Sequence, residues 1–202
     1  MVAPAPAPAP EPSLCQWFMG GSFGQLSGVD SNLESLSVAD ATDVSDLDFD
    51  MYTLHVGRSL TNQNGWDVAA FLEVGYLDGD VTLEESLFSS FEAPQTTDTD
   101  LDFDIIPVTA NIMVEHTIYG PISGYATAGA GYAWTEVSGD IDSDSDGGFY
   151  AQASLGLIYN INESFELFGG ARWLYLNDLG FGDSSLELDD SFAWEIGARV
   201  NF

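Results

Sequence analysis

The amino-acid sequence predicts an all-β protein, an eight-stranded antiparallel up-and-down transmembrane β-barrel. Three observations carry this prediction: apolar residues alternate with period two, connections alternate between short and long, and acidic residues gather in the long connections. A period of two is typical of a strand with one apolar face, and each segment reaches the ~9–11 residues that a tilted strand needs to cross a bilayer. The expected strands cover residues 16–26, 47–59, 66–77, 101–116, 121–137, 147–161, 163–177 and 190–202.

The chain begins with a segment that does not belong to the barrel. The sequence MVAPAPAPAPEP lacks the basic and apolar regions of a signal peptide, and its repeated prolines favour an extended spacer. We therefore expect residues 1–14 to be a disordered Pro/Ala-rich spacer and residues 15–202 to form the barrel. Cys15 is the single cysteine, which excludes an intrachain disulfide, and it is interpreted as a buried or interfacial thiol.

The third and the last segments show the alternation most clearly. In the third, one face consists of Val68, Ala70, Leu72, Val74 and Tyr76, while Asp67, Phe71, Glu73 and Gly75 occupy the other. In the last, Trp194, Ile196, Ala198, Val200 and Phe202 share a face opposite Glu195, Gly197, Arg199 and Asn201. An apolar face unbroken over a membrane's thickness predicts that the barrel faces lipid.

The connections between the segments alternate in length. Short connections are expected at LTNQNG (residues 60–65), at TIYG (residues 117–120) and around Asn162. Long loops are expected at about residues 27–46, 78–100, 138–146 and 178–189. With an even number of strands, this arrangement places both chain ends on the side of the short turns.

Charge follows the same division. The chain has 33 acidic and three basic residues, and its net charge is -30. Regions 27–50, 78–104, 136–146 and 178–190 together hold 26 of the acids and no Lys or Arg. A soluble globule with this imbalance would repel itself, a disordered chain would lack the 13% aromatic residues, and nucleic-acid binding is excluded because no basic patch exists. No run approaches the ~20 apolar residues of a membrane-spanning helix.

Aromatic residues are expected to form two belts at the membrane boundaries. The belt at the short turns contains Trp17, Phe18, Trp66, Tyr119, Tyr159, Phe165 and Phe202. The belt at the long loops contains Phe49, Tyr52, Tyr76, Trp134, Phe149, Trp173, Tyr175 and Trp194. This sorting favours a membrane barrel over the alternative of a soluble lipocalin-like barrel.

Over residues 16–202, and most specifically in the last strand SFAWEIGARVNF, the sequence resembles the small outer-membrane β-barrel family of OmpA/OmpX-type and opacity-protein-like barrels. The resemblance implies a bacterial outer-membrane location, periplasmic termini and turns, extracellular loops, and contact with outer-membrane lipids. It also implies that the barrel-assembly machinery reads a signal at Trp194, Ala198, Val200 and Phe202. Phe202 can equally serve as a belt aromatic.

The inward faces of the strands carry the first candidate site. Glu195 and Arg199 are expected inside, with the inward set of the seventh segment, Glu166, Phe168, Gly170, Arg172, Leu174 and Leu176, and with Glu73. Eight strands leave room for side chains and no open channel. The preferred interpretation is a lumen ion-pair network of Glu73, Glu166, Arg172, Glu195 and Arg199 that plugs the barrel. The alternative is a gate that opens when a pair exchanges partners.

The second candidate site is an acidic loop, DIDSDSDGG. Asp142, Asp144 and Asp146 fit the start of a calcium-loop pattern, but Ala153 stands where the bidentate Glu is needed, so an EF-hand is rejected. Weak binding of Ca²⁺ or Mg²⁺ by Asp140, Asp142, Asp144 and Asp146 stays open, beside the simpler interpretation of a solvated loop. Divalent cations would also bridge the acidic end to lipid phosphates.

Catalysis is not expected. His55 and His116 are the two histidines, and neither lies near the outer rim, where a Ser nucleophile and oxyanion donors would have to meet. Three functional hypotheses follow: a non-enzymatic, monomeric envelope component that presents acidic loops to a cation, host or surface partner; a small gated pore; and, as the weakest, a lipid-modifying enzyme.

Overall fold

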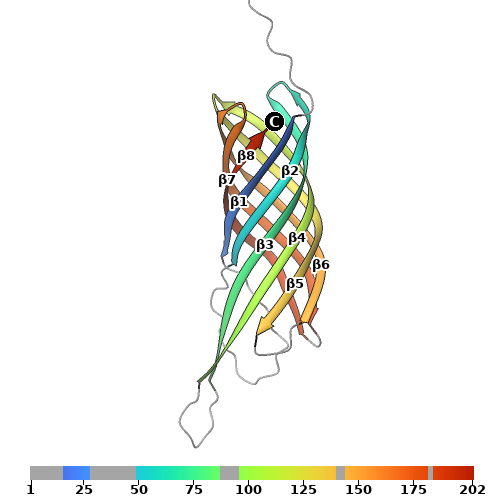
Figure 1. The fold of residues 1–202 in the computed structure, drawn as a ribbon, viewed down its shortest axis with the longest axis vertical. Helices are drawn as coiled ribbons and strands as arrows, with labels where there is room; N and C mark the ends of the chain where they lie inside the picture. Colours follow the sequence, from blue (N-terminus) through green and yellow to red (C-terminus); the bar gives the residue numbers. More distant parts are fainter. Residues whose placement is uncertain (1–15, 28–48, 87–95, 140–143, 182–183) are drawn as a thin grey trace, which may run out of the picture.

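The computed structural model describes residues 16–27, 49–86, 96–139, 144–181 and 184–202, and they form one closed barrel (Figure 1). Its strands are β1 (Trp17–Ser27), β2 (Phe49–Gln63), β3 (Trp66–Ser86), β4 (Thr96–Tyr119), β5 (Ile122–Gly139), β6 (Asp144–Asn162), β7 (Phe165–Phe181) and β8 (Ser184–Asn201). Each strand pairs antiparallel with the next, and β1 pairs with β8. The predicted fold class and strand number are confirmed. None of the described residues belongs to a helix long and apolar enough to cross a membrane.

The barrel closes through its first and last strands. The Trp17 amide donates to the Phe202 carbonyl at 3.0 Å, and the Phe202 amide donates back to Trp17 at 2.8 Å. Phe202 thus lies beside the start of β1, at the end of the barrel that carries the β2–β3 turn (Figure 1). This turn contains Asn64 and Gly65, with φ of 54° and 79°, and two positive φ values are the geometry of the Asn-Gly hairpin turn.

The strands extend further toward the long loops than predicted. Residues 78–86 and 96–100, expected in a loop, continue β3 and β4 as a hairpin that projects beyond the barrel (Figure 1). Likewise β7 reaches Phe181 and β8 begins at Ser184, within the loop predicted at 178–189. Beyond a membrane both faces of a hairpin meet water, so it needs no apolar face, and the alternation used for the prediction fades while backbone pairing continues.

Alternation places side chains as predicted on most strands, but two belt assignments are wrong. Phe18 and Phe49 point into the lumen and are 4% and 3% exposed, because each shares the inward face of its strand. The outward faces carry large exposed apolar side chains, among them Trp17, Tyr52, Leu54, Val56, Trp66, Leu72, Ile112, Trp134, Leu155, Leu157, Trp194, Ile196 and Phe202. The outer wall is therefore the apolar surface that a lipid-facing barrel requires.

Side chains fill the middle of the lumen in three layers. The loop-side apolar layer consists of Leu26, Phe49, Met51, Leu77, Ile105, Ala133, Tyr150, Leu174, Leu176 and Ala193. The turn-side apolar layer consists of Phe18, Ala69, Met113, Tyr125 and Ile158, with Phe71 and Phe168 packed against it. Between them lies a polar layer around Arg172, since along β7 Arg172 stands between Phe168 and Leu174.

Candidate functional site

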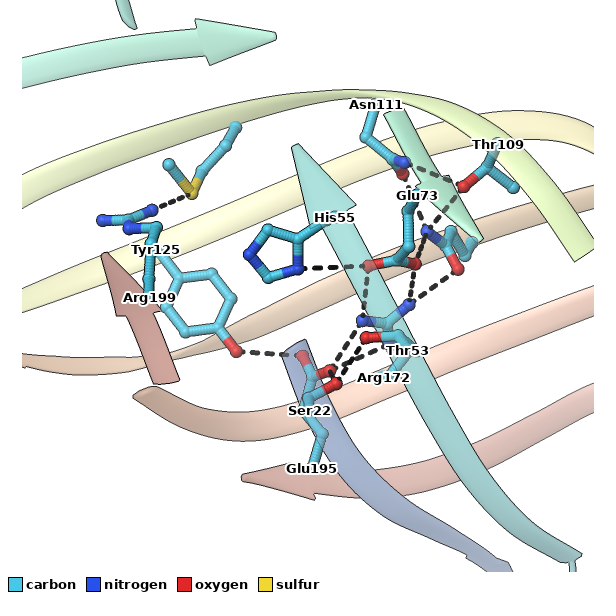
Figure 2. Close-up of polar contacts among 12 residues, drawn as sticks. Ser22, Thr53, His55, Glu73, Thr109, Asn111, Tyr125, Arg172, Glu195 and Arg199 are labelled. Carbon is cyan, nitrogen blue, oxygen red and sulfur yellow. Dashed lines mark hydrogen bonds and ion pairs between the residues drawn. The ribbon is translucent and has the colours of Figure 1, made fainter. Parts of the chain in front are cut away.

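The polar layer is built by inward positions of separate strands. Arg172 on β7, Glu73 on β3 and Glu195 on β8 are 5%, 5% and 4% exposed. Barrel closure brings these residues together although they are far apart in the sequence (Figure 2). All three side chains point into the lumen, as predicted.

Arg172 is the centre of this layer. Its Nη1 donates to Glu73 Oε1 at 2.6 Å, and its Nη2 donates to Glu195 Oε2 at 2.6 Å. Nε donates to the same Glu195 oxygen at 3.1 Å, and Nη1 also donates to Gln152 Oε1 at 2.8 Å. One guanidinium therefore holds two buried carboxylates, which arginine's planar fork of donors allows.

Neutral residues complete the network around the charges, and the sequence interpretation missed them. Gln152 Nε2 donates to Glu73 Oε1 at 2.7 Å and to Asn111 Oδ1 at 2.8 Å. The Tyr125 hydroxyl donates to Glu195 Oε1 at 3.0 Å. Arg172 Nη2 also donates to Glu73 Oε2 at 3.3 Å. Every carboxylate oxygen of Glu73 and Glu195 thus has a donor, which is the condition for buried carboxylates to be tolerated.

Arg199 belongs to a second cluster, nearer the short turns. Its Nε donates to Glu166 Oε2 at 2.5 Å, and its Nη2 donates to Glu115 Oε2 at 2.9 Å. Its guanidinium carbon lies 5.1 Å from the centre of the Phe18 ring. The five charged residues predicted as one network therefore form two groups, and Glu115, which was not predicted, is part of the second.

A small cavity separates the two groups. Its volume is about 30 Å³, and its lining includes Phe71, Phe168, Arg172 and Arg199. A water molecule needs at least ~10–15 Å³ of such volume, so the space suits about two waters and no larger solute.

The two histidines lie apart from each other. His55 is inside, with Nδ1 3.9 Å from Glu73 Oε2 and its ring packed near Phe71. His116 is at the short-turn end, where it stacks on Trp66 with 4.2 Å between ring centres and its Nδ1 lies 3.0 Å from the Gly65 carbonyl oxygen. Neither contact joins a histidine to a serine hydroxyl.

The strand register creates a further feature that the sequence interpretation missed. Asp50 pairs with Asp78, Asp78 with Asp104, and Asp104 with Glu136, so four carboxylates stand side by side across β2, β3, β4 and β5. They face outward, because Met51, Leu77, Ile105 and Thr135 beside them are buried. We call these four residues the carboxylate row.

The carboxylate row lies at the loop-side edge of the apolar wall, next to the belt aromatics Tyr52, Tyr76 and Trp134. The Tyr76 hydroxyl donates to Asp104 Oδ1 at 2.5 Å, and Gln25 Nε2 donates to Asp50 Oδ1 at 3.3 Å. Like charges placed directly opposite each other destabilise a sheet. The four carboxylates therefore repel one another along the row.

The predicted cation ligands cannot be placed. Asp140 and Asp142 lie outside the described residues, and Asp144 and Asp146 lie at the start of β6, opposite Val137 and Thr135 of β5. Within the described part of the chain, no three His, Cys, Asp or Glu side chains are grouped so as to hold a metal ion. Cys15 also lies outside the described residues.

Comparisons with known proteins give structural matches alone. No protein-family model and no curated protein sequence matches the chain. Neisserial surface protein A is similar with a TM-score of 0.57 and 14% identity, over 93% of this chain and 97% of that one. The outer-membrane protein OprG from Pseudomonas aeruginosa is similar with a TM-score of 0.52 and 15% identity, over 94% and 96%. The fold is that of the small outer-membrane β-barrels.

A small outer-membrane barrel fold does not specify an activity. The outer-membrane protease OmpT from Escherichia coli is also similar, with a TM-score of 0.50, 6% identity and coverage of 93% of this chain and 95% of that one. At such identities the likeness shows the fold alone, and function has to be argued from the residues of the site.

Proposed function

We propose that the chain is a non-enzymatic bacterial outer-membrane barrel, closed to solutes, which stabilises the envelope and presents an acidic surface at its long-loop end. In this proposal the short turns and both termini face the periplasm, and the outer wall contacts outer-membrane lipids. The protein acts as a monomer that the barrel-assembly machinery inserts by reading Trp194, Ala198, Val200 and Phe202. The apolar outer wall supports the membrane location, and the backbone pairing of Phe202 with Trp17 supports the part of the proposal that puts both ends of the barrel on the side of the short turns.

The observation that carries the closed state is the filled lumen. The polar layer around Arg172 lies between two apolar layers, whose buried residues include Leu77 on the loop side and Met113 on the turn side. An ion crossing the barrel would have to break a doubly paired guanidinium and also pass two narrow, largely apolar layers, and hydrophobic constrictions block ions by excluding water.

A gated pore is the second candidate, and the shared guanidinium favours it. Because Arg172 bonds both Glu73 and Glu195 at 2.6 Å, it could release one carboxylate while keeping the other. The weaker candidate, a lipid-modifying enzyme, would need a nucleophile beside a histidine, whereas His55 contacts Glu73 and aromatic rings.

Conductance in planar bilayers separates the first two candidates. We expect silent traces for the full chain and also for Arg172→Ala, because the apolar layers remain after the ion pair is lost. An unrelated open porin in the same bilayer provides the positive control. If the wild type showed discrete channel openings, and if Arg172→Ala abolished or enlarged them, the closed-barrel proposal would be wrong and the gated pore would take its place.

The acidic surface implies a cation partner, and the carboxylate row supports this part of the proposal. Loosely bound Ca²⁺ or Mg²⁺ would screen the four carboxylates from one another and bridge them to lipid phosphates. No closed cage of ligands is needed for this role, since phosphate and water oxygens supply the remaining coordination. A separate part of the proposal is that the acidic loops also bind an extracellular ligand.

Chelation tests the cation partner. In vesicles with anionic lipid, replacing 10 mM Ca²⁺ by EDTA should lower the melting temperature by about 3 °C, the shift produced when a ligand at roughly ten times its Kd is removed. The variant Asp50→Asn/Asp78→Asn/Asp104→Asn/Glu136→Gln should melt at the same temperature in both conditions. If neither Ca²⁺ nor Mg²⁺ changed the melting temperature or the loop mobility of the wild type, the proposal of a cation partner would be wrong.

A further inference from the structure

Arg58 differs from the other two basic residues of the chain. Arg172 and Arg199 are buried in the lumen and paired with carboxylates. Arg58 lies on β2, points outward and is exposed. Among the described residues it makes no ion pair with a carboxylate, and its guanidinium carbon lies 5.9 Å from the centre of the Trp17 ring.

The surroundings of Arg58 place it on the apolar outer wall at the short-turn end. It pairs with Trp17 on β1 and with Ala70 on β3. The neighbouring outward residues on its own strand, Val56 and Leu60, are 47% and 52% exposed. Trp17 exchanges backbone hydrogen bonds with the last residue, Phe202. A permanent positive charge is thus set among exposed apolar side chains at the level of the belt aromatics.

The proposed membrane orientation decides what this charge meets. A guanidinium on a lipid-facing wall reaches for the nearest polar boundary, which here is the headgroup level of the leaflet at the short turns. The abundant anion at that level is the phospholipid phosphate, and arginine binds phosphate through two parallel N–H donors. The Trp17 ring lies 5.9 Å from the guanidinium carbon, within the range of a cation–π contact, which does not use the N–H donors.

The two ends of the outer wall carry opposite charges. The carboxylate row at the loop end repels phosphate unless cations intervene, whereas Arg58 attracts it directly. We propose that Arg58 and Trp17 form a headgroup site for the phosphate of one phospholipid in the leaflet at the short-turn end. This site rests on the proposed membrane function, because it needs the short-turn belt to lie at a lipid headgroup level.

Native mass spectrometry of the full chain, released from a neutral detergent without phosphate groups, tests the site. The probes are phosphatidylglycerol, diacylglycerol with the same acyl chains, and inorganic phosphate. We expect the wild type to hold one phosphatidylglycerol more tightly than diacylglycerol, and Arg58→Gln to lose about fivefold of that affinity, as for one basic residue at a membrane surface. Arg58→Lys, which keeps the charge but loses the fork, should retain part of it.

Trp17→Phe should weaken phosphatidylglycerol binding by about twofold, because phenylalanine offers a weaker ring face to the guanidinium. Its matched control is Trp66→Phe, a belt tryptophan at the same end that stacks on His116 and not on Arg58, and this variant should bind as the wild type does.

Three results would overturn the site: equal binding by wild type and Arg58→Gln, equal binding of phosphatidylglycerol and diacylglycerol, or binding of inorganic phosphate as tight as that of the lipid. Protease protection in vesicles is measured in parallel on the same variants. A chain that fails to insert contradicts the proposed function, whereas a chain that inserts but shows no dependence on Arg58 contradicts the headgroup site alone.

Discussion

Replacing Arg172 with alanine is expected to destabilise the folded barrel by about 3–5 kcal/mol, the usual cost of removing one partner from a buried ion pair. The substitution leaves the Glu73 and Glu195 carboxylates, 5% and 4% exposed, without the guanidinium that bonds both. Gln152 and Tyr125 would still donate to them, but neutral donors do not compensate charge. Urea unfolding of the chain in lipid vesicles, followed by tryptophan fluorescence, measures this loss.

Two variants show whether the loss comes from uncompensated charge. Arg58→Ala removes the same side chain from the exposed outer wall, where one basic residue at a membrane surface contributes about 1 kcal/mol, and we expect it to cost no more than that. The triple variant Arg172→Met/Glu73→Gln/Glu195→Gln removes all three charges and should recover most of the stability lost in Arg172→Ala. If Arg172→Ala cost no more than Arg58→Ala, the polar layer would not contribute to stability as argued.

Replacing Gly170 with alanine is expected to destabilise the barrel by about 1–3 kcal/mol, through overpacking. Gly170 faces the lumen on β7, opposite Gly156 on β6. A Cβ at this position would lie 2.7 Å from the Gly156 Cα and would also press on the Leu155 carbonyl group. These neighbours are backbone atoms and cannot rotate away, so the β6–β7 pairing has to deform.

The adjacent glycine provides the matched control. Gly169 faces outward, and a Cβ there would first meet the Glu195 carbonyl oxygen at 3.1 Å. The same Gly→Ala change therefore meets far less resistance, and its reduction of unfolded-chain entropy offsets part of the cost. We expect Gly169→Ala to change stability by less than about 1 kcal/mol. Equal losses in the two variants would contradict the packing argument.

Alternation along a strand predicted which side chains share a face, but it could not predict which of them meet. Glu73, Arg172 and Glu195 were placed inside by the period of two alone. Their pairing depends on how strands are staggered around the closed barrel, and no single segment contains that information. For this reason the two clusters were merged into one, and the alignment of Asp50, Asp78, Asp104 and Glu136 was not foreseen.

Some of what was missed could have been found in the sequence. Glu115 shares the inward face of its strand with Asn111 and Met113, and Phe18 and Phe49 likewise lie at inward positions. If the alternation had been applied to aromatic residues and to residues at the strand ends, instead of assigning aromatics to belts, it would have placed Glu115, Phe18 and Phe49 inside the barrel. The extended β3–β4 hairpin was harder to predict, because outside a membrane a strand can pair without any apolar face.

The seam between β1 and β8 has a consequence for the order of folding. Trp17 and Phe202 exchange hydrogen bonds across the longest sequence separation within the barrel. Contacts of this kind require the largest loop closure, and they slow folding. Consecutive hairpins such as β2–β3 and β6–β7 need only their own neighbouring residues in order to pair, whereas the ring closes only when β8 meets β1. Until then β1 and the growing sheet each keep an open edge, a state prone to pairing with other chains. The barrel therefore loses its last open strand edges only in the step that pairs β8 with β1.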